Sequence, residues 1–345
     1  MKKARASDRD PANAVKDARP GVDEAEANMP APSEESPGDG HYRGVEEQAR
    51  LERWRQEPAS MLADIEQTTD PRCGESLVRL VNVHKAFGSL KVLRGVSLDF
   101  CRGHTTVVIG PSGTGKSVLL KHIVGLLQPD RGEVYFGDQR VDQLGERELV
   151  AIRTRIGFLF QMGGLFDSLD VGDNVEFPLV QHTRMNPDQR AERCDRVLRM
   201  VGLSGLQRKF PIQLSGGQKK RVALARAIIM EPLLVLYDEP TTGLDPIRSD
   251  LINELIIGLG RKLGITSLVV THDMTSALKV ADRMILLYEG RVCHDGTPRD
   301  FVSSDDPLVQ RFIQGQADQR ELSAIRSGLE DADAENHAGA RGLGN

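Results

Sequence analysis

The eight residues Gly110–Ser117 constrain this chain more than any other stretch of its sequence. They read Gly-Pro-Ser-Gly-Thr-Gly-Lys-Ser and lie between an apolar run, Thr105–Ile109, and the apolar helical pattern of Val118–Leu127. A glycine-rich turn between a strand and a helix points its backbone N–H groups at one spot, and the helix N-terminus adds roughly half a positive charge there. In this context the spelling predicts a phosphate-binding loop rather than a glycine-rich hairpin without a ligand.

The residues of this loop have separate expected roles. The glycines let the backbone turn tightly, and Lys116 supplies a full positive charge to terminal phosphates. The Ser117 hydroxyl is expected to bind the Mg²⁺ that accompanies those phosphates. We therefore expect a nucleotide with its Mg²⁺ at this loop, held by Gly110, Pro111, Ser112, Gly113, Thr114, Gly115, Lys116 and Ser117.

Composition argues against several classes of partner. The formal net charge of −5 gives no general attraction to nucleic acid, and aromatic residues are only 4% of the chain, too few for base-stacking platforms. The N-terminal residues 1–17 contain no apolar segment and do not read as a secretory signal. No stretch approaches the roughly 18–20 apolar residues that span a bilayer. If the protein works on a membrane, we expect another chain to cross it.

The two ends of the chain differ in composition from its middle. Residues 1–75 are rich in Ala, Pro, Asp, Glu and Arg and are expected to be a disordered extension. Residues 316–345 are polar and rich in Gly, Ala and Asp, and are expected to be a flexible tail. The folded domain is therefore expected at 76–315.

The four cysteines give no sign of a metal site. Cys73, Cys101, Cys194 and Cys293 lie far apart, without a CxxC or Cys/His pairing, which favours reduced thiols over metal ligands or bridges. Asn186-Pro187 predicts the start of a helix that runs to about Val201. Cys194 falls on the apolar face of this helix and is expected in the core.

The apolar runs predict an α/β fold with a parallel sheet. Runs without internal polar residues, such as Leu233–Tyr237 and Ser267–Val270, are typical of strands buried on both faces. Helical patterns separate them, as at Arg248–Leu263. Further strands are predicted at Leu77–Val83, with His84–Gly88 as a turn, and at Val92–Phe100, Glu133–Phe136, Ile156–Phe160, Met284–Tyr288 and Arg291–Cys293.

Two adjacent carboxylates follow the apolar run Leu233–Tyr237. Asp238 is suited to hold the shell of Mg²⁺, and Glu239 to orient and deprotonate an attacking water. An Asp-Glu pair is often only a solvated turn, but it rarely follows four apolar residues in a chain that also has a phosphate loop. The pair therefore predicts hydrolysis of the bound nucleotide.

A second anion site is predicted at Leu214-Ser-Gly-Gly-Gln218, which opens the helical pattern Lys219–Met230. Paired glycines and a serine hydroxyl at a helix N-terminus favour anion binding. One nucleotide does not need two γ-phosphate cradles within one monomer. The sequence therefore predicts a head-to-tail homodimer, in which Ser215 and Gly217 of one copy close over the nucleotide held by the other.

These motifs together resemble the nucleotide-binding subunits of ATP-binding-cassette (ABC) transporters, over about residues 77–315. The landmarks follow the family's order: the Walker A loop Gly110–Ser117, the Gln161 loop, the Leu214–Gln218 signature, the Walker B segment Val235–Glu239, Gly243-Leu-Asp245 and Thr271-His272-Asp273. The resemblance implies a RecA-like parallel-sheet core, an antiparallel β subdomain, and a helical signature subdomain at about 162–220.

The resemblance also implies roles for single residues. Phe87 would stack on the adenine of ATP, Gln161 would reach Mg²⁺ and the attacking water, and His272 would reach the γ-phosphate. Asp245 would lie across the dimer interface. The implied catalytic residues are Glu239, His272 and Gln161; the nucleotide contacts beyond the phosphate loop are Phe87, Ser215, Gly216, Gly217, Gln218 and Asp245; the metal ligands are Ser117, Gln161 and Asp238.

The segment after Gln161 resembles a narrower group within the family. Phe160–Leu179, the following His182-Thr183, and the tail Gly296–Gly315 resemble the ATPases of MCE-associated lipid transporters, which include the Mla phospholipid system. The resemblance implies a homodimer, peripheral on the cytoplasmic side of the inner membrane. Its implied partners are an MlaE-like permease, an MCE-domain lipid-binding protein and, as a further candidate, a small STAS-type subunit, but no nucleic acid.

Other functions remain open at this point. The ATPase could serve an amino-acid or methionine importer or a drug exporter instead of a lipid transporter. A soluble ABC ATPase that acts on DNA or ribosomes is disfavoured, because those relatives carry an inserted coiled coil or two cassettes in tandem. A Rossmann enzyme is disfavoured because no GxGxxG follows a strand.

Overall fold

The computed structural model describes residues 74–316, 323 and 327. The expectations of a disordered extension before Gly74 and a flexible tail after Gln316 therefore concern segments outside the described residues. Among the helices of the described part, none is long and apolar enough to cross a lipid bilayer.

A six-stranded sheet lies at the centre of the described chain, in the order β10-β9-β3-β8-β7-β6. Its five strands from β9 to β6 are parallel, and β10 closes the sheet as an antiparallel partner of β9. The strands are β3 (Thr105–Ile109), β6 (Ile156–Leu159), β7 (Leu234–Asp238), β8 (Thr266–Thr271), β9 (Arg283–Tyr288) and β10 (Arg291–Gly296). Strands β3 and β8 are buried along their whole length, as their apolar runs predict for strands covered on both faces.

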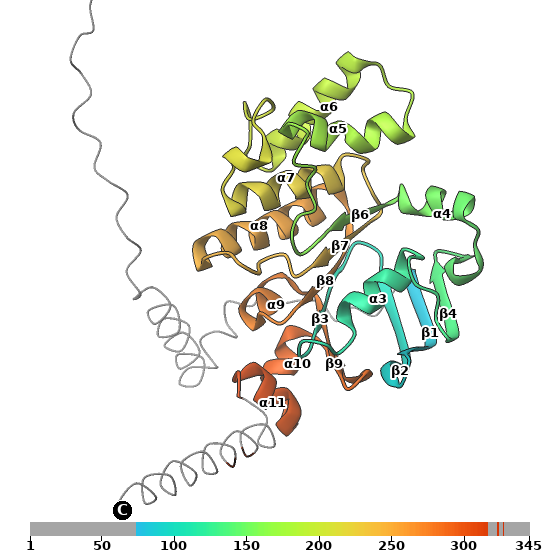
Figure 1. Cartoon of the computed structure of the whole chain (residues 1–345). Coiled ribbons are helices and arrows are strands. Elements are labelled where there is room, and N and C mark those ends of the chain that lie inside the picture. The colour runs from blue at the N-terminus through green and yellow to red at the C-terminus, as the bar shows by residue number, and fades with distance from the viewer. Residues whose placement is uncertain (1–73, 317–322, 324–326, 328–345) are drawn as a thin grey trace, which may run out of the picture. The chain divides into compact units, whose positions relative to one another are not determined.

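A second, antiparallel sheet has the order β2-β1-β4-β5 (Figure 1). It consists of β1 (Ser76–Phe87), β2 (Leu90–Cys101), β4 (Arg131–Phe136) and β5 (Gln139–Arg140). Leu80, Val96 and Val134 on one face are buried, whereas Arg79 and Arg94 on the other face are exposed. This alternation is typical of an antiparallel sheet with one face on the core and one in water.

Most helices begin at a side chain that caps them. Asp170, Asn186 and Asp245 each accept a hydrogen bond from a backbone N–H of the first turn, which satisfies a donor that the helix leaves unpaired. The helices are α3 (Lys116–Ile123), α4 (Glu146–Arg153), α5 (Val171–His182), α6 (Pro187–Met200), α7 (Gly216–Ile228), α8 (Pro246–Leu263), α9 (Met274–Val280), α10 (Pro298–Val302) and α11 (Pro307–Ile313). In Figure 1, α5 and α6 lie beyond α7, away from the strands.

The parallel sheet separates two hydrophobic cores. Successive side chains of a strand point to opposite faces, so Val107 and Ile109 of β3 enter the core formed with α5 to α8, while Val108 enters the other. That other core lies between the two sheets and contains Leu119 and Leu120 of α3. Helix α3 is therefore fixed between the sheets, directly after the phosphate loop.

The predicted α/β fold, with its ABC-type parallel core and antiparallel β subdomain, is confirmed. One strand end differs from its prediction: β1 continues to Phe87 instead of turning at His84, because residues 84–87 still pair with β2. Register shifts near Val83 break the simple alternation there, which hid the strand from a periodicity argument. The helices α5 and α9 were also not predicted; α5 contains Gly172 and Pro178, which are weak helix formers.

The prediction of reduced thiols is wrong for Cys101, which is disulfide-bonded. Spacing could not reveal this bond, because bridged cysteines need to be close only in space. Cys194 and Cys293 are free. Cys194 is buried as expected, and burial raises the pKa of its thiol to about 12.

We expect Leu236→Ala in β7 to lower the free energy of unfolding by about 2–5 kcal/mol, because it removes a fully buried side chain from the core between the sheets. The control is Leu233→Ala, three residues earlier at an exposed position, with an expected loss below about 1 kcal/mol. Urea denaturation of the two variants measures both values. Equal losses would contradict the assignment of the core.

Candidate functional site

The phosphate loop has a backbone that only glycine accommodates at two points. Gly110 and Gly115 have φ angles of 157° and 99°. A Cβ atom on Gly110 would lie 2.2 Å from the carbonyl oxygen of Leu287, and one on Gly115 would lie 2.8 Å from Cγ1 of Val92. Strands β9 and β2 thus press on the loop from outside, and any larger residue would force it open.

The ammonium group of Lys116 lies in the bend of this loop. Its Nζ atom donates to the carbonyl oxygens of Gly110, at 2.8 Å, and Pro111, at 3.0 Å. It also lies 4.0 Å from Oε1 of Glu239, and its side chain is only 7% exposed. Burial lowers the pKa of Lys116, while the charges of Glu239 and Asp238 oppose that shift. The loop therefore surrounds a positive charge that is nearly shielded from water.

Ser117 and Asp238 form the second contact at the loop. The Ser117 hydroxyl donates to Oδ1 of Asp238 over 2.9 Å, and so joins the start of α3 to the end of β7. Burial raises the pKa of the Asp238 carboxyl, and the hydrogen bond from Ser117 opposes that shift. Both groups are hard oxygen ligands, the kind that Mg²⁺ prefers.

Glu239 stands in the left-handed region, with a φ of 50°, directly after β7. Its N–H group donates to the carbonyl of Val270, 2.9 Å away. Its carboxylate accepts hydrogen bonds from the hydroxyls of Thr242, at 3.1 Å, and Thr271, at 3.3 Å. A non-glycine residue in this region is strained, and such strain is common where a side chain must be aimed at a site.

His272 joins the same carboxylate from the end of the neighbouring strand. Its Nδ1 atom lies 3.0 Å from a carboxylate oxygen of Glu239, and more than half of its side-chain surface is exposed. Thr271 and Thr242 also hold Glu239; the sequence named Thr271 only as part of Thr271-His272-Asp273 and did not identify Thr242. Two features of the sequence hinted at these contacts: Thr271 directly precedes His272, and Thr242 follows Glu239 within a short turn.

Gln161 follows β6, and its backbone is tied to Glu239 through a buried lysine. Lys220 of α7 donates to the carbonyl oxygens of Gln161 and Glu239, the latter at 3.2 Å, and is 6% exposed. Burial lowers the pKa of Lys220. Sequence reasoning missed this residue; the signal was a lysine on the apolar side of a helix, next to Val222 and Ala223.

The signature residues cap helix α7. Ser215 Oγ accepts the Gln218 N–H, and Gln218 Oε1 accepts the Ser215 N–H, a reciprocal capping box. Ser215, Gly217 and Gln218 line a cavity of about 100 Å³ together with Arg221, Arg248, Leu251 and Ile252. No residue of the phosphate loop lines this cavity, so one copy of the described chain does not bring the two anion sites together.

Asp245 lies beside the same cavity, as the cap of α8. Its carboxylate accepts the Arg248 N–H and pairs with the Arg248 guanidinium at 3.2 Å. The hydrogen bond from the Arg248 N–H is the main cause that lowers the pKa of Asp245. Arg248 also packs on Gly217, since a Cβ there would meet its Cδ at 3.2 Å. Arg248, which was not identified from the sequence, thus links Asp245 to the signature.

Phe87 is the last residue of β1 and pairs with Leu90 of β2. Its side chain is 48% exposed, and Lys85 Nζ lies 5.7 Å from the ring centroid. A ring that is half exposed offers a flat surface to a ligand. Its stacking on adenine stays a prediction.

Comparison with known proteins gives a consistent set of similarities. Residues 93–242 match the family described as ABC transporter. The chloroplastic protein TRIGALACTOSYLDIACYLGLYCEROL 3 of Arabidopsis thaliana is 42% identical over 260 residues, covering 70% of this chain and 74% of that protein. The probable ribonucleotide transport ATP-binding protein mkl of Mycobacterium leprae is 38% identical, covering 69% of each chain.

Two further similarities concern a bacterial phospholipid system and a solved structure. The intermembrane phospholipid transport system ATP-binding protein MlaF of Escherichia coli K12 is 37% identical over 243 residues, covering 70% of this chain and 90% of that protein. A dimeric bacterial ABC transporter cassette superposes with a TM-score of 0.61 at 36% identity, covering 64% of this chain and 99% of that chain.

We expect Lys220→Met to lower the free energy of unfolding by about 1–3 kcal/mol, because the carbonyl groups of Gln161 and Glu239 would lose their buried, charged hydrogen-bond donor. Lys219→Met, at the adjacent and more exposed position, should change it by less than about 0.5 kcal/mol. Urea midpoints measure the difference. Indistinguishable midpoints would show that Lys220 does not anchor these backbones.

Proposed function

Because this chain belongs to the ABC transporter ATP-binding family, we propose that it hydrolyses ATP to power lipid movement through a separate membrane permease. The observation that carries the chemistry is the contact of Glu239 with Lys116 at the phosphate loop. Lipid as cargo is supported by similarity to MlaF, whose name specifies phospholipid transport, and by the name of the Arabidopsis relative.

The phosphate loop and Lys116 would hold the β- and γ-phosphates of ATP. The Lys116 ammonium is already inside the bend of the loop and needs only to exchange its two carbonyl partners for phosphate oxygens. Phosphoryl transfer in such sites depends mainly on positioning and on stabilisation of charge. The buried ammonium suits this task, since charge interactions are stronger where water is excluded.

Mg²⁺ fits the same site. Within residues 74–316 no cluster of three or more His, Cys, Asp or Glu side chains could hold a metal, but Mg²⁺ bound to phosphates needs only one or two protein ligands. Ser117 and Asp238 would supply these ligands. Gln161, which the resemblance to ABC ATPases implies as a further ligand, would reach the ion from the segment after β6. Bound there, Mg²⁺ would neutralise charge on the phosphates.

Glu239 would take the proton of the attacking water. Its carboxylate is held by Thr242 and Thr271 and the side chain is only 12% exposed, so it has a fixed direction. His272 would contact the γ-phosphate, with its ring oriented by Glu239. General bases of this kind contribute roughly 10²–10⁴-fold to a rate.

A second copy of the chain would complete the site. Ser215, Gly216, Gly217 and Gln218 would close on the γ-phosphate of ATP held by the partner, and Asp245 would lie at the interface. Support comes from the separation of the signature cavity from the phosphate loop and from the dimeric cassettes among the solved structures. Residues 76–315 would form this ATPase domain, with 162–220 as its helical subdomain.

The permease would dock on the segment that begins at Phe160 and continues past Gln161. Large apolar side chains are exposed there, including Phe160, Phe166 and Met162, the last of which is 90% exposed. Exposed apolar clusters of this kind mark protein contacts. The protein would then be peripheral on the cytoplasmic side of the membrane, with an MlaE-like permease, an MCE-domain protein and a small STAS-type subunit as partners.

We expect Glu239→Gln to retain ATP binding and to lower the rate of ATP hydrolysis by roughly 10²-fold or more, because the amide cannot accept the proton of water. The control is Glu289→Gln, the same change at another glutamate with a left-handed backbone, on an exposed turn. Single-turnover hydrolysis and nucleotide binding are measured on both variants. Near-normal hydrolysis by Glu239→Gln would refute the assignment.

The cargo is tested by purifying the full chain from its native membranes with its partners. We expect a permease accompanied by a lipid-binding MCE protein. A periplasmic solute-binding protein in their place would indicate an importer of small solutes and would overturn the lipid proposal. This result would leave the ATPase proposal unaffected, since hydrolysis is tested on the chain alone.

A further inference from the structure

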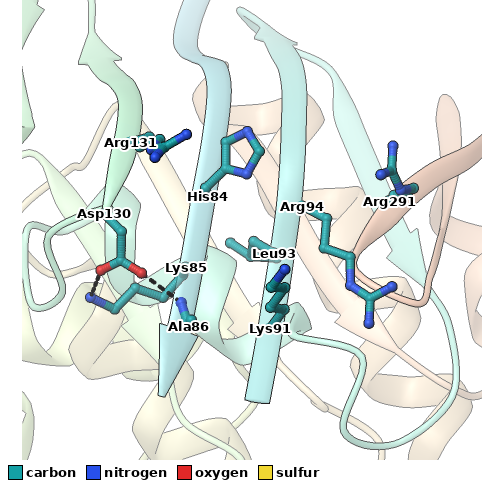
Figure 2. Close-up of a pocket in the computed structure, with 9 residues that line it drawn as sticks. All are labelled: His84, Lys85, Ala86, Lys91, Leu93, Arg94, Asp130, Arg131 and Arg291. Atoms are coloured by element: carbon teal, nitrogen blue, oxygen red, sulfur yellow. Dashed lines mark hydrogen bonds and ion pairs between the residues drawn. The ribbon is translucent and has the colours of Figure 1, made fainter. Parts of the chain in front are cut away.

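The antiparallel sheet carries a basic cavity of about 570 Å³, and none of the phosphate-loop residues 110–117 lines it. It is lined by His84, Lys85, Ala86, Lys91, Leu93, Arg94, Asp130, Arg131 and Arg291 (Figure 2). The phosphate loop and α3 lie against the other face of this sheet, where Val92 touches Gly115. Two lining residues also lie near the nucleotide site, since Leu93 packs on Gly115 and Lys85 lies 5.7 Å from the Phe87 ring centroid, whereas Arg94 and Arg131 are exposed.

The sheet register brings cationic side chains together on this face. His84 of β1 pairs with Arg94 of β2 on one side and with Arg131 of β4 on the other. The turn before Arg291 lies beside them, since the Arg94 N–H donates to the Gly290 carbonyl over 2.8 Å. We call Lys91, Arg94, Arg131 and Arg291 the cationic row.

Among the described residues, this cationic row has no counter-charge of its own. Asp130 is the only acid of the described chain that lines the cavity, and it is already bound to Lys85 Nζ at 2.8 Å and to the Ala86 N–H at 2.7 Å, as Figure 2 shows. Within residues 74–316, no side chain of the cationic row forms an ion pair. Like charges in neighbouring cross-strand positions repel and destabilise a sheet, so a bound anion would stabilise it.

We propose that the cationic row binds a soluble anion with two or more phosphate groups. The cavity has the volume typical of small-ligand sites, about 300–1,000 Å³. Its three guanidinium groups can each form two parallel hydrogen bonds to phosphate, and Lys91 adds a point charge. Several charges gathered in one concave space suit a compact polyphosphate better than an extended acidic peptide, whose charges are spread along its chain.

The test is a calorimetric titration of the full-length chain carrying Lys116→Ala with inorganic tripolyphosphate, because this substitution removes the ammonium by which the phosphate loop would compete for the probe. Arg94→Gln combined with Arg131→Gln is expected to weaken binding by about 50-fold or more, since each lost charged contact accounts for roughly tenfold. The matched control is Arg147→Gln combined with Arg299→Gln, which removes two exposed charges elsewhere and should leave the affinity unchanged.

A thermal melt without ligand checks that the variants fold. All four substitutions are at exposed positions, and relief of repulsion should leave the melting temperature of the row variant equal or higher. Absence of tripolyphosphate binding, or equal binding by both double variants, would overturn the proposal. So would binding only to phosphatidylcholine vesicles that contain phosphatidic acid, since that result would identify a membrane surface as the ligand.

Discussion

The order of three neighbouring parallel strands, β3-β8-β7, is the constraint on which the site depends. Their carboxyl ends deliver the phosphate loop, Thr271-His272 and Asp238-Glu239 to one edge of the sheet, because Ile109 pairs with Thr271 and Asp238 with Val270. No other strand separates these three segments. Groups that are more than a hundred residues apart in sequence thereby come within hydrogen-bond distance, as Ser117 and Asp238 do at 2.9 Å.

Buried charge is the second theme of the site. Lys116 and Lys220 are both buried and both donate hydrogen bonds to backbone carbonyls. Lys116 also lies 4.0 Å from the Glu239 carboxylate, and Lys220 donates to the Glu239 carbonyl. Burial of an unpaired ammonium would cost free energy, and the surrounding carbonyl and carboxylate oxygens offset this cost. Lys220 additionally connects the Gln161 backbone to the Glu239 backbone, which links the exposed segment after Gln161 directly to the proposed general base.

Much of this could be predicted from sequence because the motifs are local. The phosphate loop, the acidic pair after β7 and the helix caps each consist of a few adjacent residues. The fold class could be inferred from the order of these motifs and of the apolar runs between them. Lys220, Arg248 and the cationic row could not be predicted, because their partners are set by long-range packing and strand register. The same reason hid the disulfide of Cys101, while the bulges near Val83 hid the end of β1.

The central claim is that two copies of this chain enclose ATP, each supplying half of each pocket. The most direct test is sedimentation of the Glu239→Gln chain, with and without saturating Mg·ATP, because slow hydrolysis would preserve the closed state. The account predicts a dimer with Mg·ATP and a monomer without nucleotide. A chain that binds ATP but remains a monomer, even with its permease present, would contradict it.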